Sequence, residues 1–353
     1  MKYAITLQKK LRKTGKIRQM KRIIGIGNAL VDALAVLNDD ELLSVFGLPK
    51  GGMTLIGDDE QLRIQECFAA LDVQQATGGS AGNTMLALAN LSVRPGFIGT
   101  IGDDNIGNFF ADNCAACGIT PYMVRLPRQS GIAYTFISPD GERTFATYLG
   151  AAAMMAPENL TEDMFAGYDY LYVEGYLVQN HALILRAVEL AKAAGLKVCL
   201  DLASYNIVAS DRDFFNHLLT NYVDIVFANE DESYAFTHLN PEESVRAISE
   251  QCQIAVVKVG KNGSYVKSGE KQYHIGAITT SCTDSTGAGD LFAGGFLHAL
   301  SDGFDIRRCA EIGTIAAGRV VEIVGTKLSD ETWDEIRRIC ALYRGFMQKY
   351  TND

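Results

Sequence analysis

The chain alternates short apolar runs with longer segments of helical periodicity. The short runs are rich in β-branched residues and are typical of strands that are buried on both faces. They lie at Ile23–Gly27, Phe97–Ile101, Tyr170–Glu174, Lys197–Leu202, Asp224–Ala228 and Ile254–Val259. The longer segments predict helices at Ser80–Leu91, Ile106–Cys117, His181–Ala194 and Pro241–Gln251. Strands and helices in alternation predict an α/β fold with a mostly parallel central sheet and helices on both faces.

Two regions interrupt this alternation. Residues 31–57 and 118–150 contain strand-like segments with no crossover helix between them. The second region holds the runs Gly131–Ser138 and Arg143–Tyr148 on either side of the turn sequence Pro-Asp-Gly-Glu, which predicts a β-hairpin. We expect the two regions to form a small second sheet. It would act as a lid over the strand ends, where open α/β sheets bind ligands.

The most informative polar sequence is Thr286-Gly-Ala-Gly-Asp290, which precedes an apolar run of helical spacing. The backbone N–H groups of Gly287, Ala288 and Gly289 would gather at a helix N-terminus, which favours a phosphate or an oxyanion. Because Asp290 would repel that anion, its simplest role is to remove a proton from a hydroxyl that attacks a phosphoryl group. The alternative is a helix terminus whose aspartate only complements the dipole.

Other glycine-rich turns and polar strand ends accompany this sequence. Gly78, Gly79 and Asn83 belong to a Gly-Gly-Ser-Ala-Gly-Asn segment that opens a helix, where glycines let a ligand approach the backbone. The alternative is a turn in which Ser80 is a plain N-cap. Asp32, just beyond the first strand, is either a ligand for sugar hydroxyls or an ordinary turn carboxylate.

Three further motifs are more ambiguous. Asn229 and Glu232 lie three residues apart at a helix start, where they would either orient Mg²⁺ water molecules or form a capping box. Gly260 and Gly263 form a turn between two strand runs, and such a turn can lie along a nucleotide. The segment from Gly25 to Leu30 begins like a dinucleotide fingerprint but lacks its third glycine, which leaves a dehydrogenase as a rival class.

Composition narrows the class of protein. The 353 residues are 48% hydrophobic, enough for one large core, and no apolar run reaches the roughly 18 residues that span a bilayer. Nine Lys and Arg side chains lie in the first 22 residues, so the net charge of −10 leaves about −19 on the remainder. An acidic body argues against nucleic-acid partners. We expect residues 1–19 to be a disordered basic extension, with a nucleic-acid-binding arm as the alternative, on a cytoplasmic protein.

Taken in order, these motifs resemble those of the ribokinase-like (PfkB) family of carbohydrate and nucleoside kinases. The resemblance runs from about Lys21 to about Thr326 and includes the sequence Gly99-Thr-Ile-Gly-Asp-Asp-Asn-Ile-Gly107. Within the family, Gly27-Asn28 with Asp32, the Lys50-Gly-Gly-Met sequence and the hairpin around Arg143 are most similar to the adenosine kinase branch.

The resemblance implies a three-layer α/β/α fold with a small β lid, and transfer of the γ-phosphoryl group of ATP to a primary hydroxyl with Mg²⁺. It implies that Asp290 is the base, that Gly287, Ala288 and Gly289 form the anion hole, and that Arg143 closes on the phosphate. The acceptor positions that it implies are Asn28, Asp32, Gly78, Gly79 and Asn83. The ATP positions are Asn229, Glu232, Gly260, Gly263 and Thr286, with Glu232 reaching Mg²⁺ through water.

The acceptor itself stays open at this point. An adenosine-like nucleoside is the first interpretation, and the alternative is a sugar kinase for ribose, fructose or a keto-deoxy sugar acid. A non-catalytic binding relative is a further alternative. Tyr134, Phe136, Phe145 and Tyr148 are candidates for stacking on a base, although each fits a half-buried strand as well. We expect a small-molecule partner, no membrane partner, and a monomer or homodimer.

Overall fold

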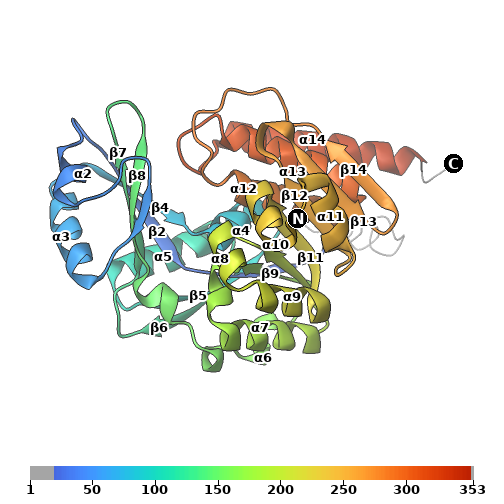
Figure 1. Ribbon diagram of the computed structural model, residues 1–353, viewed down its shortest axis with the longest axis horizontal. Helices are drawn as coiled ribbons and strands as arrows, with labels where there is room; N and C mark the ends of the chain where they lie inside the picture. Colours follow the sequence, from blue (N-terminus) through green and yellow to red (C-terminus); the bar gives the residue numbers. More distant parts are fainter. Residues whose placement is uncertain (1–19, 351–353) are drawn as a thin grey trace, which may run out of the picture.

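The structure, a computed structural model, describes residues 20–350, and the predicted basic extension at residues 1–19 lies outside the described residues (Figure 1). Nine strands form a large sheet in the order β14-β13-β12-β11-β10-β9-β1-β5-β6. Their bounds are β1 Ile23–Ile26, β5 Gly96–Gly102, β6 Thr120–Leu126, β9 Tyr170–Glu174, β10 Lys197–Asp201, β11 Val223–Asn229, β12 Ile254–Lys258, β13 Ser264–Ser268 and β14 Lys271–Ile275. The β12–β13 and β13–β14 pairs are antiparallel and the other six pairs of this sheet are parallel, which confirms the mostly parallel sheet.

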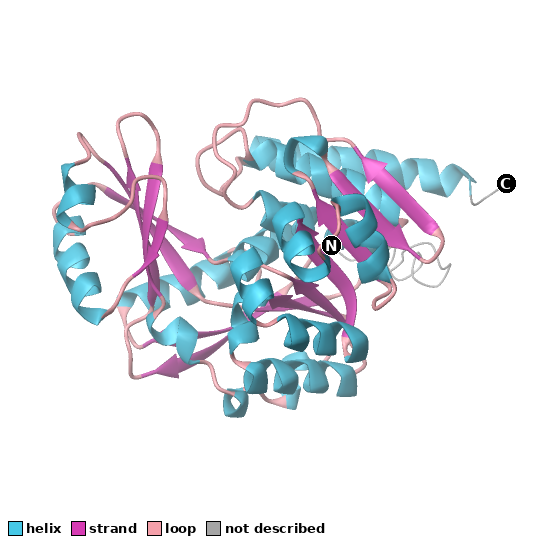
Figure 2. Cartoon of the chain, in the orientation of Figure 1, coloured by secondary structure: helices cyan, strands magenta, loops and turns pink. Residues whose placement is uncertain are grey.

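Helices cover both faces of the large sheet (Figure 2). One face packs against α4 Ser80–Asn90, α5 Asn105–Ala116, α12 Ala288–Asp302, α13 Ile306–Val320 and α14 Asp330–Tyr350. The other packs against α6 Glu162–Phe165, α7 His181–Ala193, α8 Tyr205–Ser210, α9 Arg212–Asn221, α10 Glu230–Thr237 and α11 Pro241–Ser249. The apolar run of β1 is continuous because both of its faces are buried. Ile23 packs in the core on the α4 face, while Ile24 and Ile26 pack in the core on the α7 face. The predicted α/β/α layering is confirmed.

A second sheet of five strands, which we call the small sheet, stands beside the large one (Figure 1). Its order is β3-β8-β7-β2-β4. The strands are β2 Leu30–Val36, β3 Met53–Leu55, β4 Val73–Gly78, β7 Gly131–Ile137 and β8 Arg143–Tyr148, and the helices α2 Glu41–Val45 and α3 Asp58–Phe68 cover its outer face. The hairpin predicted around the Pro-Asp-Gly-Glu turn is β7 and β8.

The predicted bounds of the small sheet need two corrections. Strand β6, inside the region 118–150, pairs in parallel with β5 in the large sheet, because α5 supplies the crossover between them. Strand β4 lies outside both predicted regions and pairs with β2 in the small sheet. Its sequence, Val-Gln-Gln-Ala-Thr-Gly, lacks the β-branched run that marks a buried strand.

The two sheets are joined where the ligand site is expected. The chain leaves β1, passes through Gly27 to Ala29 and enters β2, and it returns from β4 through Gly79 into α4. The small sheet is therefore attached at the carboxyl end of β1. Among the described residues, no helix has both the length and the apolar character that a membrane crossing requires.

Candidate active site

The loop that opens α12 has the geometry of an anion-binding site. Gly287 is the residue before the first helical turn, and its φ of 74° lies in the left-handed region. A Cβ atom at this position would lie 2.4 Å from Cγ2 of Thr326, so both the backbone conformation and the packing require glycine. The N–H groups that follow lie at the positive end of a 15-residue helix.

The carboxylate of Asp290 is fixed in the first turn of α12 by two side chains of α4. Its Oδ1 atom accepts a hydrogen bond from Ser80 Oγ (2.7 Å), and its Oδ2 atom accepts one from Asn83 Nδ2 (2.9 Å). Thr326 donates to Asn83 Oδ1 (3.2 Å), which fixes the orientation of the amide. The N-cap of α4 is Gly79, so the alternative in which Ser80 is a plain N-cap is wrong.

Burial is the main reason that Asp290 is a stronger base than an ordinary aspartate. It raises the pKa of Asp290 to about 6, and the negative charge of Asp201 adds to the rise. The hydrogen bonds from Asn83 and Ser80 and the positive charge of Lys258 oppose it. At neutral pH the group is still mostly ionised and can accept a proton.

Asp32 lies on β2, near the carboxylate of Asp290. Burial raises its pKa to about 6, the charge of Arg143 lowers it, and the charge of Asp290 raises it again. A Cβ atom on Gly78 would lie 2.4 Å from Asp32 Oδ1. Gly79, with a φ of 81°, would place a Cβ atom 2.3 Å from the Asn28 carbonyl oxygen. Gly78 thus allows β4 to pass close to Asp32, and Gly79 allows the start of α4 to pass close to Asn28.

Asn28 reaches this region through Glu174, a residue to which the sequence analysis gave no role. Glu174 is buried at the end of β9, and its Oε1 atom accepts a hydrogen bond from Asn28 Nδ2 (2.7 Å). Its Oε2 atom accepts one from the backbone N–H of Ala81 (2.9 Å). Burial raises the pKa of Glu174 to about 7. A carboxylate at the end of a buried strand is the sequence signal that could have marked it.

A cavity of about 410 Å³ lies on the other side of the α12 loop. Gly260 and Gly263 line it from the turn between β12 and β13, and Ala288 and Gly289 line it from α12. Lys258 at the end of β12, the loop that precedes α12, and α13 supply most of its remaining walls. It therefore adjoins the anion-binding loop directly, while Thr286 lies just before that loop.

Asn229 and Glu232 form the capping box that was the alternative interpretation of their spacing. Asn229 donates to both carboxylate oxygens of Glu232, from its backbone N–H and from Nδ2 (2.7 Å each), and Glu232 N–H donates to Asn229 Oδ1 (2.8 Å). Burial and the charge of Asp201 raise the pKa of Glu232 to about 7.

The carboxylate of Glu232 is compatible with a magnesium contact through water. Over residues 20–350, no three His, Cys, Asp or Glu side chains cluster as a ready-made metal site. Mg²⁺ beside a triphosphate usually keeps several water ligands and takes one or two carboxylates. A buried carboxylate near the cavity, already oriented by hydrogen bonds, fits that arrangement.

Arg143 extends from β8 of the small sheet to the loop before α12. Its Nη1 atom lies 3.0 Å from Asp284 Oδ2, and only 8% of the arginine side chain is exposed. Asp284 also accepts hydrogen bonds from the N–H groups of Thr286 and Gly325 (2.9 Å each). Burial opposes ionisation, but these hydrogen bonds and the charge of Arg143 hold the pKa of Asp284 below its usual range.

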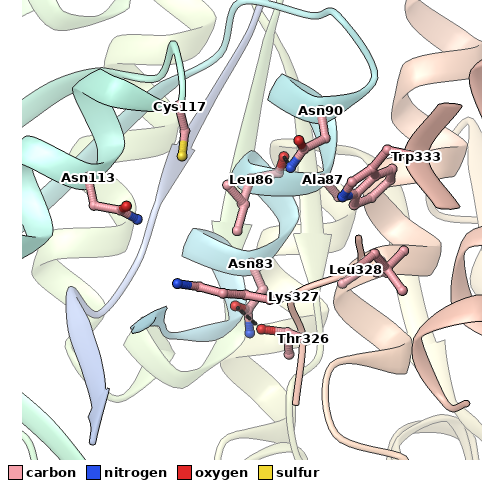
Figure 3. A pocket seen from close by; sticks show the side chains of 11 residues that line it. Asn83, Leu86, Ala87, Asn90, Asn113, Cys117, Thr326, Lys327, Leu328 and Trp333 are labelled. Carbon is pink, nitrogen blue, oxygen red and sulfur yellow. Dashed lines mark hydrogen bonds between the residues drawn. The ribbon is translucent and has the colours of Figure 1, made fainter. Parts of the chain in front are cut away.

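A smaller cavity of about 210 Å³ borders the site on the far side of Asn83 (Figure 3). Asn83, Leu86 and Asn90 line it from α4, and Trp333 closes it from α14. Lys327 lies across Asn83 in this view, next to Thr326 (Figure 3). The positive charge of Lys327 lowers the pKa of Asp32.

The structure thus brings Asp32, Gly78, Gly79, Asn83 and Arg143 close to the α12 loop, and Gly260 and Gly263 line the 410 Å³ cavity beside that loop. The chain matches the pfkB family of carbohydrate kinases over residues 40–333. It belongs to that family. The predicted resemblance is confirmed, and the chain is a phosphotransferase with an alcohol group as acceptor.

Relatives of this PfkB kinase act on different acceptors, as their names state. An ATP-dependent ribose-1-phosphate kinase of Halopiger xanaduensis is 30% identical over 70% of the chain and 82% of the relative. A 5-dehydro-2-deoxygluconokinase of Bacillus subtilis is 29% identical over 74% of the chain and 86% of the relative.

The solved structures include one named for a nucleoside and one named for a sugar. Adenosine kinase from Sinorhizobium meliloti superposes with a TM-score of 0.79 and 31% identity, covering 91% of this chain and 99% of that one. A probable sugar kinase from Rhizobium etli has a TM-score of 0.80 and 30% identity over the same shares. The family membership therefore establishes a kinase without selecting a nucleoside or a sugar.

Proposed function

We propose that this PfkB kinase transfers the γ-phosphoryl group of ATP to the primary hydroxyl of a purine nucleoside such as adenosine. The observation that carries the chemistry is the placement of Asp290, between Ser80 and Asn83 at the N-terminus of α12. A carboxylate with a raised pKa, next to a cluster of N–H donors, suits proton removal beside a phosphoryl group. The 31% identity to the Sinorhizobium meliloti adenosine kinase supports the nucleoside.

In the proposed reaction, each element of the site has one task. Asp290 takes the proton from the acceptor hydroxyl while Ser80 and Asn83 keep its carboxylate in place. The N–H groups of Gly287, Ala288 and Gly289 stabilise the charge on the transferred group. Arg143 holds the small sheet near the α12 loop, which excludes water and so limits hydrolysis of ATP.

ATP would occupy the 410 Å³ cavity with its phosphates toward the α12 loop. A drug-sized ligand typically fills a pocket of about 300–1,000 Å³, so the base and ribose of a nucleotide fit. Mg²⁺ would accompany the phosphates, held through water by Glu232, and would neutralise part of their charge.

The inner face of the small sheet supports a nucleoside as the acceptor. Side chains alternate between faces along a strand, and the register of β2, β7 and β8 places Asp32, Phe145 and Arg143 on one face. Tyr134, Phe136 and Tyr148 lie on the opposite face, in the core under α2 and α3. We assign Asp32 to the ribose hydroxyls and the half-buried Phe145 to the base.

The direct test is an ADP-release assay with a panel of acceptors. We expect the highest kcat/KM with adenosine or another purine nucleoside, and lower values with ribose, fructose and a keto-deoxy sugar acid. The second candidate is a sugar kinase, which the relatives named for ribose 1-phosphate and 5-dehydro-2-deoxygluconate favour. Preference for a sugar over every nucleoside would support it, and no ADP release with any acceptor would favour a non-catalytic binding protein.

A further inference from the structure

A largely buried lysine lies where the 410 Å³ cavity meets the α12 loop. Lys258 is the last residue of β12, its side chain is 15% exposed, and it lines the cavity. Its Nζ atom is 3.1 Å from Oδ2 of Asp201, the last residue of β10, whose side chain is 8% exposed. Neither residue belongs to a motif that the sequence analysis assigned.

Lys258 also lies against the second glycine of the α12 loop, Gly289. A Cβ atom on Gly289 would lie 3.0 Å from Lys258 Nζ. The ammonium group is therefore held against the same backbone whose N–H groups would bind a phosphoryl group. An anion on this loop would come within a few ångströms of Nζ.

The surroundings of Lys258 keep it charged. Burial lowers its pKa, but the negative charges of Asp201, Glu232 and Asp290 more than offset burial, and the net pKa is raised. The ammonium group is consequently present at neutral pH. Among residues 20–350 only Asp201 accepts a hydrogen bond from it, so donors remain for a second acceptor.

We propose that Lys258 is a catalytic residue that binds an oxygen of the γ-phosphoryl group, with Asp201 holding it in place. This inference rests on the proposed function, because ATP supplies that group. The charge on the transferred group and the leaving oxygen changes during phosphoryl transfer, and a fixed cation beside them lowers the barrier without reorganisation. The competing interpretation is a buried ion pair that only stabilises the fold.

A pair of variants separates the two interpretations. Lys258→Met removes the ammonium group but leaves Asp201 buried and unpaired, which destabilises the protein by itself. The double variant Lys258→Met with Asp201→Asn removes both charges, so its melting temperature should recover. Loss of one preorganised stabilising group typically lowers kcat by about 10²–10³-fold, and we expect that loss in both variants with the acceptor KM within about threefold of the wild type.

Lys192→Met is the matched control. Lys192 forms an ion pair with Asp224 near the start of β11, at the opposite end of the parallel strands from Lys258. We expect this variant to keep the wild-type kcat. Recovery of the double variant to more than about a tenth of wild-type kcat would overturn the catalytic role of Lys258 and leave only a structural one.

A binding measurement makes the test independent of the acceptor. Isothermal titration with AMP-PNP·Mg²⁺ and with ADP·Mg²⁺ compares ligands that differ in the third phosphoryl group. In the double variant we expect the affinity for AMP-PNP to fall about tenfold or more while that for ADP changes less than threefold. Equal changes for both ligands would contradict the role of Lys258. Failure of the wild type to bind either nucleotide would instead contradict the proposed function.

Discussion

The guanidinium of Arg143 and the carboxylate of Asp284 join the small sheet to the loop that precedes α12, with Nη1 3.0 Å from Oδ2. Both side chains are almost fully buried, and Asp284 also accepts hydrogen bonds from the backbone N–H groups of Thr286 and Gly325. The position of the small sheet is thereby coupled to the loop that would bind the phosphoryl group. The Arg143 atoms Nε and Nη2 have no hydrogen-bond partner among residues 20–350, so this side chain can still take up a ligand oxygen.

Replacement of Arg143 should uncouple ATP use from transfer. In Arg143→Met we expect kcat for the acceptor to fall at least tenfold, because a loosely held lid admits water and misplaces the acceptor. ATP hydrolysis in the absence of acceptor should rise relative to transfer, which ADP release with and without nucleoside measures.

Lys50→Met is the control for that variant, since Lys50 pairs on the exposed surface of the small sheet with Asp40 and Asp140. Surface ion pairs contribute about 0–1 kcal/mol, so its coupling ratio should equal that of the wild type. An unchanged ratio in Arg143→Met as well would show that the ion pair does not hold the lid.

Asp32 and Glu232, with pKa values raised to about 6 and about 7, titrate on the acidic limb of the pH–rate profile, and that limb should also include Asp290. Its raised pKa of about 6 means that the carboxylate becomes protonated as pH falls through 6 and can no longer accept the hydroxyl proton. We therefore expect kcat to be highest above about pH 7 and to decline at least tenfold per unit well below pH 6. A rate that stays constant down to pH 4.5, on protein shown to remain folded by circular dichroism, is the contrary outcome.

Gly287→Ala should damage both stability and activity. A residue with a Cβ atom pays about 1–2 kcal/mol in the left-handed conformation, and here the atom would also lie 2.4 Å from Thr326 Cγ2. Gly195→Ala provides a control, because Gly195 has a φ of 80° with open space around it. We expect thermal unfolding to show a loss of about 1–2 kcal/mol in the control and a larger loss in Gly287→Ala, with kcat reduced only in the latter.

Replacement of Phe145 should affect the KM for a nucleoside more than the KM for a free sugar. If it packs against the base, Phe145→Ala raises the KM for adenosine by about 5–10-fold, since one aromatic contact contributes about 0.5–1.5 kcal/mol beyond its burial. The KM for ribose should change less than twofold. Phe136→Leu serves as a control for core packing, because Phe136 is fully buried beneath the outer helices. Equal changes for both acceptors would remove Phe145 from the base site.

The sequence predicts the parts of this molecule that depend on local pattern. Continuous apolar runs locate the buried parallel strands, and the Thr286–Asp290 loop stands out because its glycines and aspartate conflict with an ordinary helix start. Strand β6 was misassigned because pairing partners lie far apart along the chain: its neighbour β5 comes before an intervening helix.

The rest of the site depends on contacts that no local pattern contains. Glu174 and Lys258 both end strands in sequences that read as ordinary core, and their roles follow from Asn28 and Asp201, which lie 146 and 57 residues away. Asn229 and Glu232 have the residue types and the spacing of a capping box. The same types and spacing are expected of a phosphate site, so the sequence does not separate the two roles. The structure shows the cap, and the second role stays a prediction.

The most direct test of the central claim is the turnover of Asp290→Asn beside Asp302→Asn, a control at the other end of α12. A general base contributes roughly 10²–10⁴-fold, so the account predicts a barrier higher by about 3–5 kcal/mol in Asp290→Asn with nearly normal ATP binding. The control should keep the wild-type rate. If Asp290→Asn retained more than about a tenth of wild-type turnover, Asp290 would not be the base.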